Sequence, residues 1–78
     1  MLVTINMQKT GFNIRRLMDE NGMTVKDLQN ELGFGHPFAI YKWLNGKNLP
    51  ALDNLVILAK LFKTPMDAII ITDDRRAV

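Results

Sequence analysis

The stretch from residue 24 to residue 47 constrains the fold of this chain more than any other segment. Apolar residues recur in it at helical spacing in two short runs: Val25, Leu28 and Leu32, and then Ile40, Trp43 and Leu44. Glycines at 33 and 35 separate the runs, and Asn45-Gly46 ends the second one. These runs predict two short helices that cross steeply through the glycine-containing turn between them.

Two short helices joined by a glycine-containing turn make a helix-turn-helix, whose second helix can enter the major groove of DNA. We therefore predict a helix-turn-helix unit at about residues 24–46, with its DNA-reading helix at about 36–45. With the second apolar run turned inward, helical geometry leaves Phe38, Lys42 and Asn45 on the opposite face, and Tyr41 on its flank. Trp43 is predicted to be a core residue.

The residues of this outer face are the predicted base-reading residues: Phe38, Tyr41, Lys42 and Asn45. A lysine can donate to guanine O6 and N7, and a phenylalanine can pack on a thymine methyl group. For Lys42, a phosphate contact or plain surface exposure are the alternatives. For Phe38, they are packing against the preceding helix or turn, and burial by a protein partner.

Polar residues that ring the reading helix are the predicted phosphate contacts: Thr24, Lys26, His36, Lys47 and Asn48. For each of them, exposure without a DNA contact is the alternative. His36 or Gly35 is also predicted to cap the reading helix, with Pro37 in its first turn. A lone histidine with no carboxylate or second ligand beside it does not indicate catalysis.

Three further helices are predicted around this unit. Apolar spacing indicates a helix over residues 7–20 and a nearly all-round apolar helix over 52–62, which we expect in the middle of the domain. Thr24 and Asp27 form a capping-box-like start, and Thr64-Pro65-Met66-Asp67 repeats this signal for a short last helix. The β-branched ends, 2–5 and 69–72, are predicted to pair into a ribbon with each other or with a second copy. A frayed start and a longer last helix are the alternative.

Composition limits the remaining classes. The chain has 78 residues, 47% of them hydrophobic, which predicts one folded domain over 1–78. With no cysteine and one histidine, no disulfide, metal or other cofactor is expected. No apolar run approaches the roughly 18 residues that span a bilayer, so we expect a cytoplasmic protein with no membrane partner. No nucleophile is paired with a base and no glycine-rich phosphate loop is present, so we expect no enzyme.

The net charge is only +2, but the charges are unevenly distributed. Between Leu32 and Pro65 there are four lysines and one acid, Asp53, whereas most other acids lie nearer the two ends. One basic and one acidic flank would orient the domain on a polyanion such as DNA. Asp19, Glu20, Asp73 and Asp74 are expected to lie away from the DNA side.

Residues 14–70 resemble the phage-repressor and Cro-type (XRE-like) helix-turn-helix family of transcriptional regulators. The matching motifs follow the family's order and spacing: Asn-Ile-Arg-Arg-Leu, Thr-Val-Lys-Asp-Leu, Leu-Gly-Phe, Ala-Ile-Tyr-Lys-Trp-Leu-Asn-Gly-Lys, Leu-Pro-Ala-Leu-Asp-Asn-Leu, Leu-Ala-Lys-Leu-Phe and Thr-Pro-Met-Asp. The resemblance implies an all-α, compact five-helix bundle like that of the lambda repressor, to which the terminal ribbon would be added. It also implies that the second and third helices read double-stranded DNA.

The chain departs from the family pattern in three places. Val25 stands where the family often has a glutamine that holds the phosphate backbone. The turn over 33–37 is one residue longer than the commonest form, and the reading helix starts with the apolar Pro37-Phe38-Ala39. Hydrogen-bond readout from that end of the helix is therefore reduced.

The leading functional hypothesis is a sequence-specific transcriptional regulator that occupies an operator, as a homodimer bound to two half-sites. The terminal segments and Phe12, which lies off the buried stripe of the first helix, are the candidate dimer contacts. The alternative is a protein-interaction module of the same fold, such as an antitoxin-like or host-factor-binding protein. Steep salt dependence of DNA binding would distinguish the two hypotheses.

Overall fold

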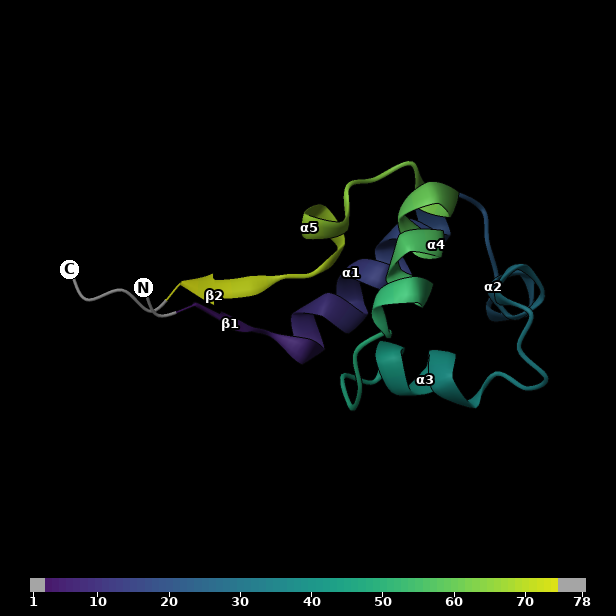
Figure 1. Ribbon diagram of the computed structural model, residues 1–78, viewed down its shortest axis with the longest axis horizontal. Coiled ribbons are helices and arrows are strands. Elements are labelled where there is room, and N and C mark those ends of the chain that lie inside the picture. Colours follow the sequence, from purple (N-terminus) through teal and green to yellow (C-terminus); the bar gives the residue numbers. More distant parts are fainter. Residues whose placement is uncertain (1–2, 75–78) are drawn as a thin grey trace.

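The computed structural model of the chain describes residues 3–74 and contains five helices and one two-stranded antiparallel ribbon (Figure 1). In chain order the elements are β1 (Val3–Ile5), α1 (Met7–Glu20), α2 (Val25–Leu32), α3 (Phe38–Leu44), α4 (Leu52–Phe62), α5 (Met66–Ile69) and β2 (Thr72–Asp74). The predicted five-helix bundle and the terminal ribbon are both confirmed. Leu2, which was included in the first predicted strand, lies outside the described residues.

Side-chain caps fix the starts of the first two helices. The Asn6 side chain accepts from the amide of Lys9 at 2.8 Å and caps α1. At α2 the capping box is complete, because Thr24 Oγ1 accepts from Asp27 N at 3.1 Å and Asp27 Oδ2 accepts from Thr24 N at 2.8 Å. The acceptor oxygens satisfy amides that have no partner within the helix.

The two predicted proline-containing starts are wrong in detail. Pro37 is itself the N-cap of α3, so neither Gly35 nor His36 caps this helix, and the cap makes no side-chain hydrogen bond. Pro65 likewise precedes α5, and Thr64 Oγ1 donates to the carbonyl of Phe62 at 3.0 Å instead of capping. In both places the helix begins one residue later than a polar cap would require.

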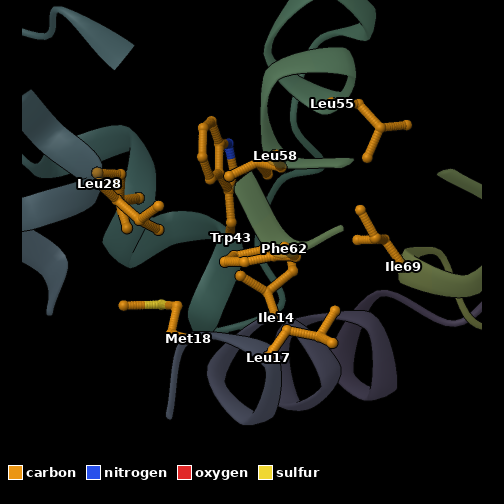
Figure 2. Packing of buried hydrophobic residues seen from close by; sticks show 10 residues of the cluster. Ile14, Leu17, Met18, Leu28, Trp43, Leu55, Leu58, Phe62 and Ile69 are labelled. Atoms are coloured by element: carbon orange, nitrogen blue, oxygen red, sulfur yellow. The ribbon is translucent and has the colours of Figure 1, made fainter. Parts of the chain in front are cut away.

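The core lies where α1, α3 and α4 meet, with α2 and α5 closing its sides (Figure 2). Its fully enclosed side chains come from all five helices: Ile14, Leu28, Ile40, Leu58 and Ile69. The expectation that α4 is surrounded by protein is wrong, because Leu52 is 72% exposed and Val56 is also exposed. The other four helices are too few and too short to cover α4 on every side. Helix α4 therefore buries only one stripe of side chains.

The ribbon joins the two ends of the described chain, with Val3 opposite Asp74 and Ile5 opposite Thr72. The second strand starts three residues later than the predicted 69–72, because Ile69 is fully buried at the end of α5. Polar groups of α1 anchor the segment between α5 and β2: Asn13 Nδ2 donates to the carbonyls of Ala68 and Ile69, and Ile71 N donates to Thr10 Oγ1 at 2.9 Å. These bonds satisfy the two buried polar side chains of α1.

A glycine lets α1 approach the end of α3 closely. A Cβ atom at Gly11 would lie 2.5 Å from the carbonyl oxygen of Trp43 and 2.7 Å from that of Leu44. Glycine is unfavourable inside a helix, so Gly11 is explained by its close contact with the end of α3 rather than by helix propensity. The absence of a side chain at Gly11 therefore sets the distance between the two helices.

Candidate nucleic-acid interface

The inner face of α3 is locked into the core. Ile40 is fully buried and Trp43 is 4% exposed, which confirms the prediction that both point inward. The Phe34 ring in the preceding turn meets the Trp43 ring edge-on, with 5.9 Å between centroids. Because α3 has only seven residues, these contacts and the close approach at Gly11 determine how it is presented.

The outer face of α3 carries every residue that we predict to read bases. Phe38 is 63% exposed, Tyr41 is 47% exposed, and Lys42 and Asn45 are both exposed. The helix therefore displays two aromatic rings, one ammonium group and one amide on a single side. Such a set offers hydrogen-bond donors together with apolar surface for base edges. The exposure is as predicted, while contact of these residues with DNA stays a prediction.

His36 lies beside Phe38. The two rings have centroids 4.3 Å apart and an interplanar angle of 31°. Phe38 thus rests on the turn that precedes α3, one of the alternatives considered from the sequence, and still exposes most of its surface. The pair places two mutually tilted rings at the N-terminal end of α3, where polar side chains were missing from the sequence. No feature of the sequence indicates this pairing.

The turn between α2 and α3 is closed by backbone and amide hydrogen bonds. Gly33 ends α2 in the left-handed conformation, with φ of 70°, which glycine adopts without strain. Phe34 N donates to the carbonyl of Gln29 at 3.0 Å, and Gln29 Nε2 donates to the carbonyl of Phe34 at 3.3 Å. Val25, at the position where the family often has glutamine, is half-buried and packs on the core.

Four of the five predicted phosphate contacts fall into two groups around α3, and the fifth, His36, is exposed in the turn before it. Thr24 and Lys26 are exposed at the start of α2. Lys47 and Asn48 are exposed just after α3, and their amides both donate to the carbonyl of Lys42, at 2.9 and 3.4 Å. Only the side chains of these two residues are therefore free to meet a phosphate.

The start of α4 is less suited to phosphate than its position suggests. Asp53 lies in the first turn, and its Oδ1 accepts from the amide of Asn54 at 2.9 Å. A carboxylate at this point occupies an amide and repels an anion. The first turn of α4 is thus a weaker candidate than the side chains of Lys47 and Asn48.

Gly11 and Gln29 are the residues that the sequence reasoning did not connect with the site. Gly11 places α3 against α1, and Gln29 holds the turn before α3. A glycine on the apolar face of a helix was the available signal for the first. The second has no sequence signal beyond its polar character.

Residues 3–74 contain neither a membrane-spanning helix nor a cluster of metal-ligating side chains. No helix in this range is long and apolar enough to cross a membrane. In the same range, no three His, Asp or Glu side chains gather in a way that could hold a metal ion.

Comparison with known proteins identifies the fold and the family. The crystal structure of the DNA-binding domain of BldD aligns with a TM-score of 0.67 over 83% of this chain and 93% of that chain, at 12% sequence identity. At this identity the likeness concerns the fold alone. The curated proteins give no significant match. A family model described as Helix-turn-helix (HTH_3) matches residues 14–69, so the chain belongs to the XRE-type helix-turn-helix family.

Proposed function

We propose that this protein is a DNA-binding transcriptional regulator that acts by occupying an operator through α3. The observation that carries the proposal is the outer face of α3, on which Phe38, Tyr41, Lys42 and Asn45 are exposed while the inner face is locked in the core. A short rigid helix with a free face is what entry into a major groove requires. Family membership and the fold shared with the BldD DNA-binding domain support the proposal.

In this proposal Lys42 donates to a guanine edge, and Asn45 and Tyr41 supply further hydrogen bonds. The His36–Phe38 pair supplies apolar contact, for which a thymine methyl group is the fitting target. Thr24, Lys26, Lys47 and Asn48 hold the phosphates on either side and so fix the register of α3. The outer face of α3 carries few hydrogen-bond donors, so each copy should read only a short half-site. We therefore expect two copies on one operator.

The test is selection of bound sequences from a random duplex library at near-physiological salt, with Lys42→Ala in parallel. We expect the wild type to enrich a two-fold-symmetric motif with half-site centres about 34–36 Å apart. If Lys42 contacts a base, Lys42→Ala weakens binding to this motif by about 1–3 kcal/mol and relaxes preference at one position. Lys60→Ala on α4 is the matched control, because it removes one exposed lysine outside the proposed site.

Salt titration separates base contacts from phosphate contacts. A phosphate contact at Lys42 would weaken binding to selected and random DNA alike and reduce the salt slope by about 1. Absence of any enriched motif from a folded wild-type chain would contradict operator occupancy.

The second candidate function is a protein-interaction module of the same fold. Two exposed apolar side chains outside α3 favour it: Phe12 on α1, at 77% exposure, and Leu52 on α4, at 72%. If this function holds, the folded chain will bind duplex DNA weakly and without sequence preference.

A further inference from the structure

The solvent face of α1 carries a large apolar side chain with no contact that explains it. Phe12 is 77% exposed in the middle of a helix whose other exposed residues are polar or charged. A bulky aromatic side chain ringed by charged residues is typical of an interaction site. We define the α1 face by five exposed residues along this helix: Lys9, Phe12, Arg16, Asp19 and Glu20.

A hollow lies directly beside the exposed ring. It has a volume of about 300 Å³ and is lined by Lys9, Phe12, Asn13, Arg16 and Ile71. The same surface therefore offers both a projecting side chain and a depression next to it. An isologous contact, in which the same patch meets itself, requires both features on one surface.

The charges along α1 also complement those of a second α1 helix that runs antiparallel to it. Lys9 lies near the N-terminal end of the face, whereas Asp19 and Glu20 lie at its C-terminal end. When two α1 helices lie antiparallel about an axis midway between Phe12 and Arg16, Lys9 of each copy lies opposite Asp19 of the other. In the same arrangement Phe12 of each copy meets Arg16 and the hollow of the other.

Arg16 is already held in place for such a contact. Its Nε and Nη2 donate to Asn13 Oδ1 at 3.2 and 2.7 Å, and Nη1 pairs with Glu20. Asn13 is in turn fixed by the carbonyls of Ala68 and Ile69. A guanidinium group held in this way loses little entropy when an aromatic ring packs on it.

The position of the α1 face suits two copies on one duplex. Phe12 lies about 100° around the helix from Gly11, the residue that faces α3. A two-fold axis parallel to the direction from α1 to α3 makes the α1 helices antiparallel neighbours and leaves both α3 helices on one side. Both α3 helices then face the same side, as two copies that meet one duplex require.

We propose that the α1 face is the contact between two copies of this chain, with Phe12 as its apolar anchor. The inference rests on the proposed function for its role in operator binding. A pair of helices about 21 Å long buries less than the roughly 1,200–2,000 Å² of a standard stable interface. The free chain therefore dimerises weakly, and DNA strengthens the contact by holding two copies close together.

The test measures self-association of the free chain by sedimentation equilibrium up to millimolar concentration. We expect weak dimerisation of the wild type and a loss of about tenfold or more in the association constant for Phe12→Glu. Leu52→Glu is the matched control, since it places the same charge at an equally exposed apolar position on α4 and leaves association unchanged. Phe12→Glu keeps the wild-type melting temperature because the side chain is exposed.

Charge reversal tests the antiparallel register. Asp19→Lys weakens association by placing lysine opposite Lys9, and the double variant Lys9→Asp with Asp19→Lys restores it. On a selected two-half-site duplex, Phe12→Glu abolishes the cooperativity of the wild type while binding to one half-site persists.

The outcomes separate the two proposals. Dimerisation that depends on Phe12 in a chain that binds no DNA would contradict the proposed function and leave the interface standing. A wild-type chain that stays monomeric at millimolar concentration, with or without DNA, overturns the interface. Equal association of the wild type and Phe12→Glu overturns it as well.

Discussion

Replacing Gly11 with alanine tests how closely α1 approaches α3. At an open position inside a helix, this change would stabilise the protein by about 1 kcal/mol, because alanine is the better helix former. Here the new methyl group would lie 2.5 Å from the Trp43 carbonyl oxygen, whereas ordinary contact begins at 3.4 Å. The helices must therefore separate by about 1 Å, since backbone atoms rather than a flexible side chain stand in the way.

Whether Gly11→Ala stabilises or destabilises the protein shows which of the two effects is larger. Overpacking of a core costs about 1–3 kcal/mol, which exceeds the gain in helix propensity. We therefore expect Gly11→Ala to lower the free energy of unfolding by about 1–2 kcal/mol, and the melting temperature by about 4–8 °C for each kcal/mol. DNA binding should weaken as well, because the C-terminal end of α3 is the part displaced.

Thermal and urea denaturation measure this effect, with Gly35→Ala as the matched control. Gly35 has no positive φ, and nothing lies within 4 Å of a Cβ built there, so its replacement should be neutral or slightly stabilising. A Gly11→Ala variant as stable as the wild type, or more stable, would refute the close approach of the two helices.

Three other changes test separate parts of the fold. Trp43→Ala should destabilise the protein by about 3–5 kcal/mol because Trp43 is only 4% exposed, and an unchanged melting temperature would mean that α3 is oriented differently. Lys63 ends α4 with φ of 53°, so Lys63→Gly should relieve strain and raise stability by about 0.5 kcal/mol, whereas Lys60→Gly inside α4 should lower it by about 1 kcal/mol. Hydrogen bonds from the backbone and side chain of Thr24 hold the pKa of Asp27 below its ordinary value of 3.8. The stabilisation from this carboxylate is thus present above about pH 3.8 and lost as the pH falls through the lowered pKa, so the stability difference between wild type and Asp27→Asn should narrow in acid. A carboxyl titration of Asp27 by NMR at or above pH 3.8 would contradict it.

Apolar periodicity predicted the helices, and local signals fixed the bounds of some of them. Asn21-Gly22 directly follows the end of α1, and the Thr24–Asp27 capping box marks the start of α2; both are local signals. The start of β2 was wrong because it depends on Ile69, whose burial is decided by helices distant in sequence. The exposed stripe of α4 was missed because its composition does not reveal which side lacks a neighbour.

In the candidate site, the exposure of single residues could be predicted from the sequence, but contacts between elements could not. Exposure of Phe38, Lys42 and Asn45 follows from helical geometry once Ile40 and Trp43 are placed inside. The pairing of His36 with Phe38 depends on the path of a turn whose length departs from the common form, so no periodic pattern contains it. The approach at Gly11 likewise depends on a distance between two helices.

The pairing of β1 with β2 gives the molecule a nearly closed loop of chain. Val3 and Asp74, the first and last described residues, pair with each other. This contact therefore closes the longest loop and should form late in folding. A two-stranded ribbon adds little stability of its own, and its exchange with solvent should therefore be faster than that of the helices. A short linker between Val3 and Asp74 would remove this entropy cost. New ends could then be opened at the turn after α1, around Gly22, without cutting the surface that α3 presents.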